Sequence, residues 1–185
     1  GFALSTHHLL KKVDENFKFD FFDSLKCCLP KAYSIFYKEN NMYRKIRYED
    51  KEIYIQLSKE FYSSNAVAHA IPNENYEKTF EQLTKGTPYA DCYIFEHEGE
   101  EAGYALLAKT WSNEAGGIVI WLEEIYIREN FRGKGIGTDF FAYLDSIADT
   151  ARLRLEAEPD NKAAIRLYKR TGFRELPYVQ FIKGD

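Results

Sequence analysis

Sulfur-containing residues and long apolar runs are scarce in this sequence. Its 185 residues include three cysteines and one methionine. Cys27, Cys28 and Cys92 cannot all pair with one another, and none shows metal-ligand spacing. We therefore expect no metal site and a reduced, cytoplasmic compartment. No run approaches the ~18 apolar residues that a membrane-spanning helix needs, so we expect no membrane insertion.

Neither sign of charge is in large excess. The formal net charge is −4, with 29% charged and 45% hydrophobic residues. This balance is typical of a globular protein and argues against disorder. It gives no electrostatic reason to expect binding to nucleic acid or to an anionic membrane. The length fits one domain, alone or with an appendage.

The first 41 residues differ from the rest. They are rich in phenylalanine and tyrosine, which is unlike a flexible tail, and they contain no continuous apolar core of a signal peptide. We expect a helical extension interrupted at Pro30. The only methionine, Met42, marks the start of a more regular pattern. The predicted division is therefore an aromatic-rich extension at 1–41 and one domain at 42–185.

The pattern from Met42 onward predicts an α+β fold. Alternating apolar residues and turn signals define the strands, and apolar residues at helical spacing define the helices. The predicted strands lie at 43–48, 92–96, 102–111, 118–127, 153–158 and 178–183. The predicted helices lie at 50–62, 72–86, 137–150 and 161–170. A strand–turn–helix–strand–helix unit stands at the centre of this order.

The turn at 132–138 lies directly between a strand and an amphipathic helix. Its sequence is Arg-Gly-Lys-Gly-Ile-Gly-Thr. Glycines at alternate positions allow the backbone to approach a ligand closely, and the unsatisfied N–H groups of a helix start favour an anion. Arg132 and Lys134 add cationic donors. A phosphate or pyrophosphate is the expected ligand, and the alternative is a glycine-rich connection without one.

Two common phosphate-binding motifs do not fit this turn. The dinucleotide fingerprint requires G-x-G-x-x-G, whereas the spacing here is G-x-G-x-G. The P-loop requires G-x-x-x-x-G-K-[ST], but Gly133-Lys134 is followed by Gly135 and the upstream glycine is absent.

The turn resembles the acetyl-CoA loop of the GCN5-related N-acetyltransferases, the GNAT family, which reads [QR]-x-x-G-x-[GA]. Arg132, Gly135 and Gly137 match it. The segment Leu122–Ile127 is similar to the family's fourth strand, and Asn161–Phe173 to its N-x-x-A-x-x-L-Y-x-x-x-G-F stretch. The resemblance covers about 42–183. It implies a mixed, mostly antiparallel twisted sheet with flanking helices, in which the central fourth and fifth strands splay apart.

The resemblance also implies where acetyl-CoA, or coenzyme A, binds. The loop amides of Gly133 to Thr138 would hold the diphosphate. Backbone groups of Ile125 to Ile127 would pair with the pantetheine arm as an added strand does. The implied cofactor residues are Ile125, Tyr126, Ile127, Arg132, Gly133, Lys134, Gly135, Ile136, Gly137, Thr138 and Asn161. For Asn161 an ordinary helix cap is an equal alternative.

Three residues are candidates for proton transfer. Tyr168 resembles the family's acid for the departing thiolate, and the alternative is a tyrosine whose ring fills the core. Glu123 and Glu124 stand where the fourth strand passes the expected thioester. Alternation along a strand lets only one of them face the cleft unless a bulge intervenes. The alternative for this pair is one surface carboxylate and one that is paired with a cation.

The predicted activity is acetyl transfer from acetyl-CoA to a primary amine, by direct attack in a ternary complex. The motif Leu-Glu-Glu-Ile-Tyr-Ile is particularly similar to spermidine/spermine-type enzymes, so a polyamine or another small amine is one expected acceptor. The alternatives are a peptide N-terminus or lysine, or a non-catalytic acyl-CoA-binding module. Homodimers are common in the resembled family, but the sequence contains no recognisable interface. The acceptor is expected near 62–73 and the last strands.

Overall fold

The computed structural model describes residues 42–64, 67, 70–147 and 150–184. The chain divides into two units, residues 1–40 and 41–185. All the described residues belong to the second unit. The extension predicted at 1–41 therefore lies outside the described residues.

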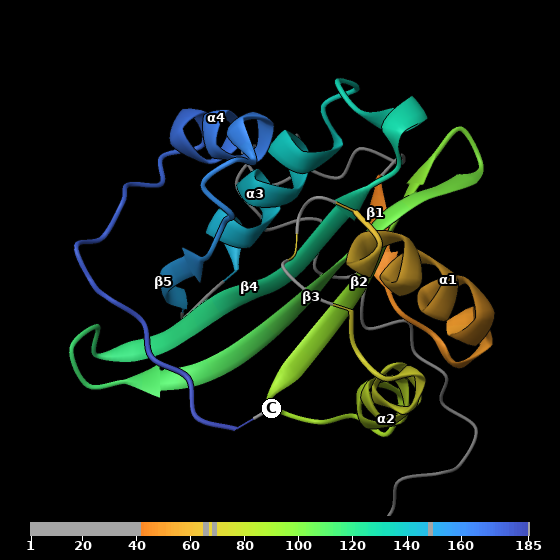
Figure 1. Ribbon diagram of the computed structural model, residues 1–185, viewed down its shortest axis with the longest axis horizontal. Helices are drawn as coiled ribbons and strands as arrows, with labels where there is room; N and C mark the ends of the chain where they lie inside the picture. The colour runs from red at the N-terminus through yellow and green to blue at the C-terminus, as the bar shows by residue number, and fades with distance from the viewer. Residues whose placement is uncertain (1–41, 65–66, 68–69, 148–149, 185) are drawn as a thin grey trace, which may run out of the picture. The chain divides into compact units, whose positions relative to one another are not determined.

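Five strands and four α-helices make up the described part of the chain (Figure 1). The strands are β1 (Tyr43–Lys45), β2 (Ala90–His97), β3 (Glu100–Ser112), β4 (Gly117–Ile127) and β5 (Thr150–Leu155). The helices are α1 (Lys51–Tyr62), α2 (Asn73–Thr84), α3 (Ile136–Ser146) and α4 (Lys162–Arg170). Two short 3-10 turns are η1 (Tyr48–Asp50) and η2 (Glu129–Phe131). None of the described helices has the length and apolarity needed to cross a membrane.

The strands form one sheet in the order β1-β2-β3-β4-β5. The first three pairings are antiparallel, and β4 and β5 pair in parallel. A parallel pair requires a crossover, and α3 supplies it between these two strands. The predicted mixed, mostly antiparallel α+β sheet is confirmed.

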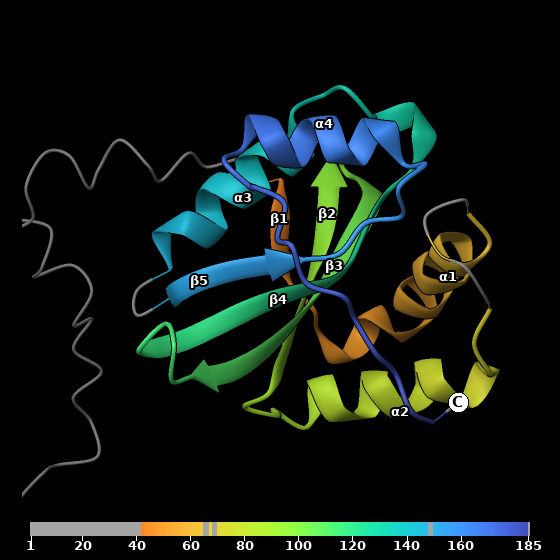
Figure 2. The same ribbon diagram turned by 60° about the vertical axis from the view of Figure 1, so that its left-hand side comes forward.

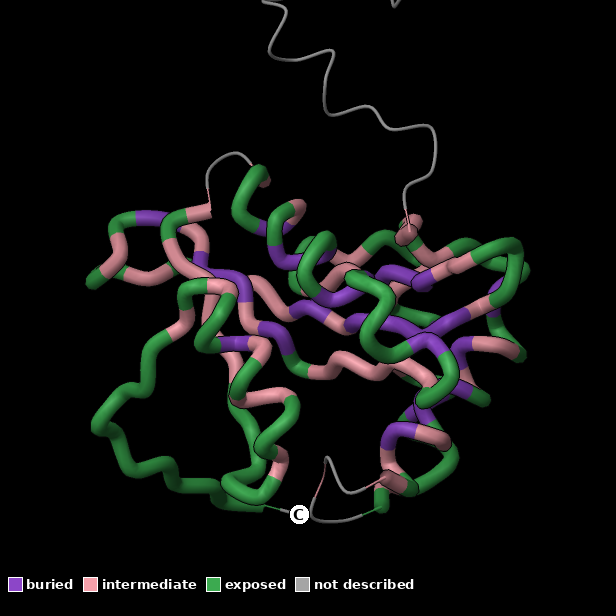
Figure 3. Tube along the Cα trace, turned by 90° about the horizontal axis from the view of Figure 1, so that it is seen from above, coloured by how far each residue is buried: buried purple, intermediate pink, exposed green. Residues whose placement is uncertain are grey.

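Helices cover both faces of the sheet (Figure 2). On one face, Tyr54 and Leu57 of α1 and Phe80 of α2 pack with buried residues of β2 and β3. On the other face, Phe140 of α3 and Tyr168 of α4 belong to a second buried cluster with β2, β3 and β4. Buried positions accordingly follow the strands through the middle of the molecule (Figure 3). The functional groups described below lie where β4 passes between these two layers.

Four predicted elements differ from the structure by three residues or more. The strand predicted at 43–48 ends at Lys45, and Tyr48 already belongs to η1. The helix predicted at 137–150 ends at Ser146, after which Ile147 adopts extended backbone angles. The strand predicted at 153–158 lies at 150–155, because its parallel register with β4 runs from Ile118 to Leu122. The strand predicted at 178–183 is wrong. That segment has strand-like composition, but it pairs with no other strand among the described residues, and Phe181 is 93% exposed.

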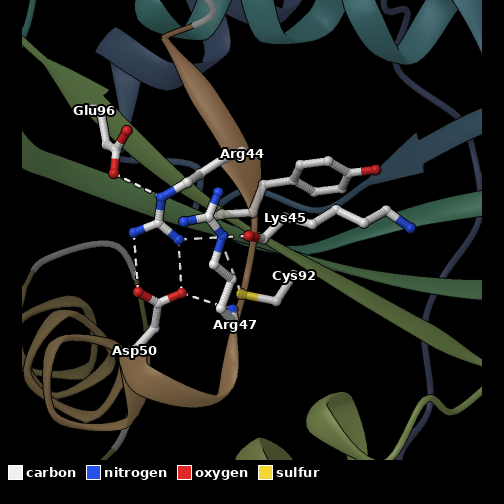
Figure 4. Close-up of polar contacts among 7 residues, drawn as sticks. Arg44, Lys45, Arg47, Asp50, Cys92 and Glu96 are labelled. Carbon is white, nitrogen blue, oxygen red and sulfur yellow. Dashed lines mark hydrogen bonds and ion pairs between the residues drawn. The ribbon is translucent and has the colours of Figure 1, made fainter. Parts of the chain in front are cut away.

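A buried ion pair joins β1 to the start of α1 (Figure 4). Arg44 donates two hydrogen bonds to the carboxylate of Asp50, at 2.7 and 2.9 Å, and a third to Glu96 Oε1 of β2 at 2.6 Å. The backbone N–H of Arg47 also donates to Asp50, at 2.6 Å. Burial alone would raise the pKa of Asp50, but these hydrogen bonds and the two guanidinium charges together lower it.

We expect Asp50→Asn to lower the free energy of unfolding by about 2 kcal/mol at neutral pH, because it leaves the partly buried Arg44 without its bidentate partner. The folded pKa of Asp50 is lowered, so its contribution is present above about pH 4, the ordinary pKa of aspartate, and is lost as pH falls below it. Urea unfolding at pH 7 and pH 3 measures both effects. Glu114→Gln is the control, since it removes only an exposed pair with Arg152. An equal loss at both pH values would contradict this role of the charge.

Candidate active site

The glycine-rich turn follows η2 and opens directly into α3. Gly135 is the N-cap of α3 and has φ of 91°, and no side chain caps the helix start. The N–H groups at the first turn are therefore open to an external acceptor. Gly133 has φ of 78°, and a Cβ added at either glycine would meet no atom within 4 Å. The turn thus combines the required backbone conformation with open space for an anion.

Gly137 has a different structural role from Gly133 and Gly135. Its Cβ would lie 3.0 Å from Cδ2 of Leu167 in α4 and 3.6 Å from Cδ1 of Ile127 in β4. The absence of a side chain lets α3 pack closely between these two elements. The third glycine of the motif therefore serves helix packing, as the last glycine of other phosphate-binding turns does.

The two cations of the turn are exposed and lie along the loop. Arg132 Nε donates to the backbone oxygen of Ile127 at 2.9 Å. Lys134 Nζ lies 5.1 Å from the centre of the Phe131 ring. Neither cation forms an ion pair within the described residues. Both remain available to an anion, because Arg132 uses only its Nε–H and its terminal guanidinium N–H groups have no partner among the described residues.

The predicted splay between the fourth and fifth strands is present. The parallel pairing of β5 with β4 ends at Leu122 opposite Leu155, while β4 continues to Ile127, which is still paired with β3. Beyond Leu122, no described strand covers the β5 side of β4. The backbone at 125–127 is thus positioned to pair with an extended ligand, apart from the Ile127 carbonyl that Arg132 already uses.

A β-bulge decides where the two glutamates of β4 point. Leu106 of β3 is opposite Glu124 and Leu107 is opposite Leu122, so Glu123 is the extra residue. Leu122 packs in the cluster with α3 and α4. Without the bulge Glu124 would point to that same face, because side chains alternate along a strand. The bulge returns it to the face of α1 and α2, so that both carboxylates leave β4 on one side.

Glu124 is held by two tyrosines from different elements. Tyr62, the last residue of α1, donates to Oε1 at 2.7 Å. Tyr104 of β3, which is fully buried, donates to Oε2 at 2.5 Å. Burial raises the pKa of Glu124, the hydrogen bonds from Tyr104 and Tyr62 oppose that rise, and the charge of Glu123 adds to it. Among the described residues, no lysine, arginine or histidine forms an ion pair with Glu124.

Glu123 occupies a more open position. It lines a hollow of about 380 Å³ together with Thr110, Trp121, Leu122 and Glu156. Partial burial raises its pKa, and the charge of Glu156 adds to the effect. The guanidinium of Arg154 lies 4.2 Å from the Trp121 ring beside it. The two carboxylates of the hollow suit a cation, while the Trp121 ring in its wall already contacts the Arg154 guanidinium.

Tyr168 lies on α4, and its ring packs against the rings of Phe141 and Phe173, with 5.7 and 6.1 Å between ring centres. Its ring is therefore part of the core, as one of the two interpretations required. Burial raises the pKa of Tyr168 to about 12. Its hydroxyl has no hydrogen-bond partner within the described part of the chain, so it is free to donate to a ligand. The role of Tyr168 as an acid stays a prediction.

Asn161 is the N-cap of α4. Its Oδ1 accepts a hydrogen bond from the backbone N–H of Ala164 at 3.2 Å. This geometry accounts for the asparagine as a cap, and its contact to a pantetheine arm stays a prediction. Cys92 is buried in the core cluster beneath α1 and α2 and forms no disulfide within the described residues. No group of residues with metal-ligating potential occurs in the described part of the chain.

The sequence pattern did not single out Tyr62 or Tyr104 as site residues. Tyr62 stood at the edge of the segment expected near the acceptor, and Tyr104 is one apolar residue within a strand. Only the register of β3 against β4 and the packing of α1 bring their hydroxyls to Glu124.

Comparison with known families agrees with this geometry. The family model described as "Acetyltransferase (GNAT) family" matches residues 33–173, more than half of the chain. The chain belongs to the GNAT family. This match begins within the segment predicted to be an extension, and it includes the glycine-rich turn, both glutamates of β4 and the whole of α4.

Individual relatives in the GNAT family are about 30% identical to this chain, and each alignment covers about half of it. The thialysine N-epsilon-acetyltransferase of Sus scrofa is 32% identical over 97 residues, covering 49% of this chain and 50% of that protein. The spermine/spermidine N(1)-acetyltransferase of Bacillus subtilis is 30% identical over 95 residues, covering 45% and 62% respectively. The aligned region thus spans about half of the length of the first relative.

Solved structures support the fold. An aminoglycoside N-acetyltransferase, AAC(6')-Iy, in complex with CoA is 18% identical to this chain, with a TM-score of 0.62, covering 77% of this chain and 93% of that one. At this identity the similarity is one of fold. The splayed sheet and the helix start after β4 therefore belong to a known GNAT architecture.

Proposed function

We propose that this protein transfers an acetyl group from acetyl-CoA to a primary amine, by direct attack within a ternary complex. The observation that carries the proposal is the half-buried carboxylate of Glu124, which has no cationic partner among the described residues and lies on the strand whose free edge leads to the open start of α3. A charge that is partly removed from water and has no opposite charge beside it is costly, and an incoming ammonium group would offset that cost.

The cofactor would be held by backbone groups rather than by a dedicated charged pocket. The uncapped N–H groups at 135–138 would bind the diphosphate, with Arg132 and Lys134 beside it. The free edge at 125–127 would align the pantetheine arm. Acetyl-CoA supplies the activated thioester when bound. The protein's contribution is to align amine and thioester, which is a large part of the rate enhancement in such transfers.

Two carboxylates and a phenol would handle the protons. An alkylammonium must lose a proton before it attacks, and Glu124 or Glu123 accepts it directly or through water. The raised pKa of both glutamates brings them nearer to neutral pH, where a base is most effective. Tyr168 would return a proton to the departing thiolate. Its hydroxyl, which has no hydrogen-bond partner among the residues that the structure describes, supports this role.

The acceptor we propose is a small amine that carries a second cationic group. Glu124 would receive the reacting amine, and the carboxylates of Glu123 and Glu156 in the neighbouring hollow would receive the other cation. The polyamine and thialysine activities of the relatives agree with this charge pattern. Aminoglycosides are a further class of amine to test, since a neighbour of the same fold acts on them.

A panel of acceptors assayed for release of coenzyme A tests the proposal. It should contain polyamines, thialysine, lysine, peptides and aminoglycosides, each with acetyl-CoA. Turnover with diamines that exceeds turnover with monoamines of equal length would support both the reaction and the acceptor class. Calorimetric binding of acetyl-CoA with no turnover on any amine would instead favour an acyl-CoA-binding module. Absence of acetyl-CoA binding to the folded protein would refute the central claim.

The proposed acid can be tested separately. We expect Tyr168→Phe to lower kcat by about 100-fold, because proton transfer to the thiolate is lost while the ring still fills the core. Acetyl-CoA affinity measured by calorimetry should stay unchanged. Phe141→Leu serves as the control for disturbed packing around the same ring. Unchanged kcat in Tyr168→Phe would remove the acid role.

A further inference from the structure

The half-buried carboxylate of Glu124 on β4 accepts hydrogen bonds from two tyrosine hydroxyls and has no cation as a partner among the described residues. The groups whose charge or hydrogen bonding couples to Glu124 come from every element packed against it: Tyr54 and Tyr62 of α1, Tyr76 of α2, Cys92 of β2, Tyr104 of β3 and Glu123 of β4. None of them is positive. If Glu124 were only structural, a neutral side chain would satisfy the same tyrosines without the cost of burying a charge.

We propose that Tyr104 and Tyr62 are positioning residues that hold the Glu124 carboxylate in one orientation toward the acceptor amine. Each tyrosine donates to a different oxygen, at 2.5 and 2.7 Å. Every carboxylate oxygen has two acceptor directions, so each retains one for an N–H of the acceptor. The inference rests on the proposed acetyl transfer, because it assigns two further residues to that same site.

The two tyrosines differ in how firmly they are held. Tyr104 is 0% exposed, and its ring packs edge-on against Tyr54 and Phe61 of α1. Tyr62 is only half-buried, and its ring packs against that of Tyr76 of α2, with 6.0 Å between the ring centres. Tyr104 is therefore the fixed anchor in the sheet. Tyr62 lies at the end of α1, where the connection to α2 begins and where the acceptor is expected to enter.

The hydrogen bonds from Tyr104 and Tyr62 to Glu124 should affect the pH dependence of activity. Hydrogen bonds donated to a carboxylate favour its charged form, so they oppose the rise in pKa that burial causes. Removing the Tyr104 hydroxyl should raise the pKa of Glu124 further. A base must be deprotonated to act, so the acid limb of the pH profile should move to higher pH. The effect of Tyr62 should be in the same direction and smaller, because its hydroxyl is the weaker of the two influences.

The test compares Tyr104→Phe and Tyr62→Phe with Tyr93→Phe in the full chain. Tyr93 is a matched control because it is equally buried, and its hydroxyl bonds to that of Tyr143 at 2.8 Å in the other core cluster. Carbon-13 NMR of glutamate carboxyl groups would follow the titration of Glu124, with the signal assigned by its loss in Glu124→Gln. The pH profile of kcat/KM and the melting temperature would be measured on the same samples.

We expect Tyr104→Phe to move both the NMR midpoint of Glu124 and the acid limb upward by about one pH unit. At the alkaline plateau kcat should fall about tenfold, because the carboxylate is no longer held in one orientation. Tyr93→Phe should change only the melting temperature. If Tyr104→Phe lowers the melting temperature but leaves the midpoint unchanged, the inference is overturned. Since the midpoint needs no turnover, it decides this question even if every acceptor in the panel fails.

Discussion

Glutamine at position 124 is expected to lower kcat for amine acetylation by about 100-fold or more, because the amide cannot take a proton from the acceptor. The change keeps the shape of the side chain. One tyrosine hydroxyl can still donate to the amide oxygen, and the other faces the amide NH2 and accepts from it. The binding of acetyl-CoA should therefore persist within about twofold. Steady-state kinetics with the best amine of the panel, together with calorimetry, measures both quantities.

Glu123→Gln is the informative comparison for this variant. The carboxylate of Glu123 lines the open hollow with Glu156, so its loss should raise KM for a diamine more than it lowers kcat. A monoamine should be affected less, since it has no second cation. The opposite result, a large fall in kcat for Glu123→Gln and none for Glu124→Gln, would exchange the roles of the two glutamates.

The second large effect concerns the start of α3. We expect Gly135→Val to raise the Kd of acetyl-CoA at least about tenfold, because a β-branched residue is strongly disfavoured at φ of 91°. The turn would have to change its backbone conformation, and the N–H groups at the helix start would no longer converge on one point. Calorimetry measures the change in affinity, and circular dichroism shows whether the fold persists.

Gly86→Val provides a matched control. Gly86 follows α2, has φ of 83° and, like Gly135, has no atom within 4 Å of an added Cβ. The substitution therefore introduces a comparable backbone strain of about 1–2 kcal/mol without touching the turn after β4. Both variants should lose similar thermal stability. If Gly86→Val weakens acetyl-CoA binding as much as Gly135→Val, the effect is general destabilisation and the turn is not the binding site.

Local sequence pattern predicted most of the elements. The strand at 117–127, the turn after it and the helix at 162–170 follow from apolar spacing, glycines and a capping asparagine, all of which are short-range signals. The prediction of a strand at 178–183 was wrong because it rested on local composition alone. Its residues favour extended backbone, but a strand also needs a second strand to pair with. A short stretch of sequence does not show whether such a partner lies beside it in the fold. The start of β5 was missed because its parallel register with β4 determines it.

In the candidate site, too, the sequence predicted some features and left others open. The order of glycines and basic residues at 132–138 was enough to predict an anion-binding turn, because that function depends on backbone conformation within a few residues. The orientation of the neighbouring glutamates was left open, since alternation along the strand lets only one of them face the cleft unless a bulge intervenes. The bulge at Glu123 settled their direction, and nothing in the residues 122–127 alone distinguishes a bulged strand from a regular one.

The spacing of apolar residues and turn signals from Met42 onward was enough to predict an α+β domain. The scarcity of cysteine gave no reason to expect a disulfide or metal framework. The loop motif together with the motifs at 122–127 and 161–173 indicated the GNAT family, which the family match over residues 33–173 confirmed. The tertiary structure alone brought Tyr62 of α1 and Tyr104 of β3 to the two oxygens of Glu124. These residues are 62 and 20 positions away from Glu124 in the chain. Contacts at such separations arise from strand register and helix packing, which no local pattern specifies.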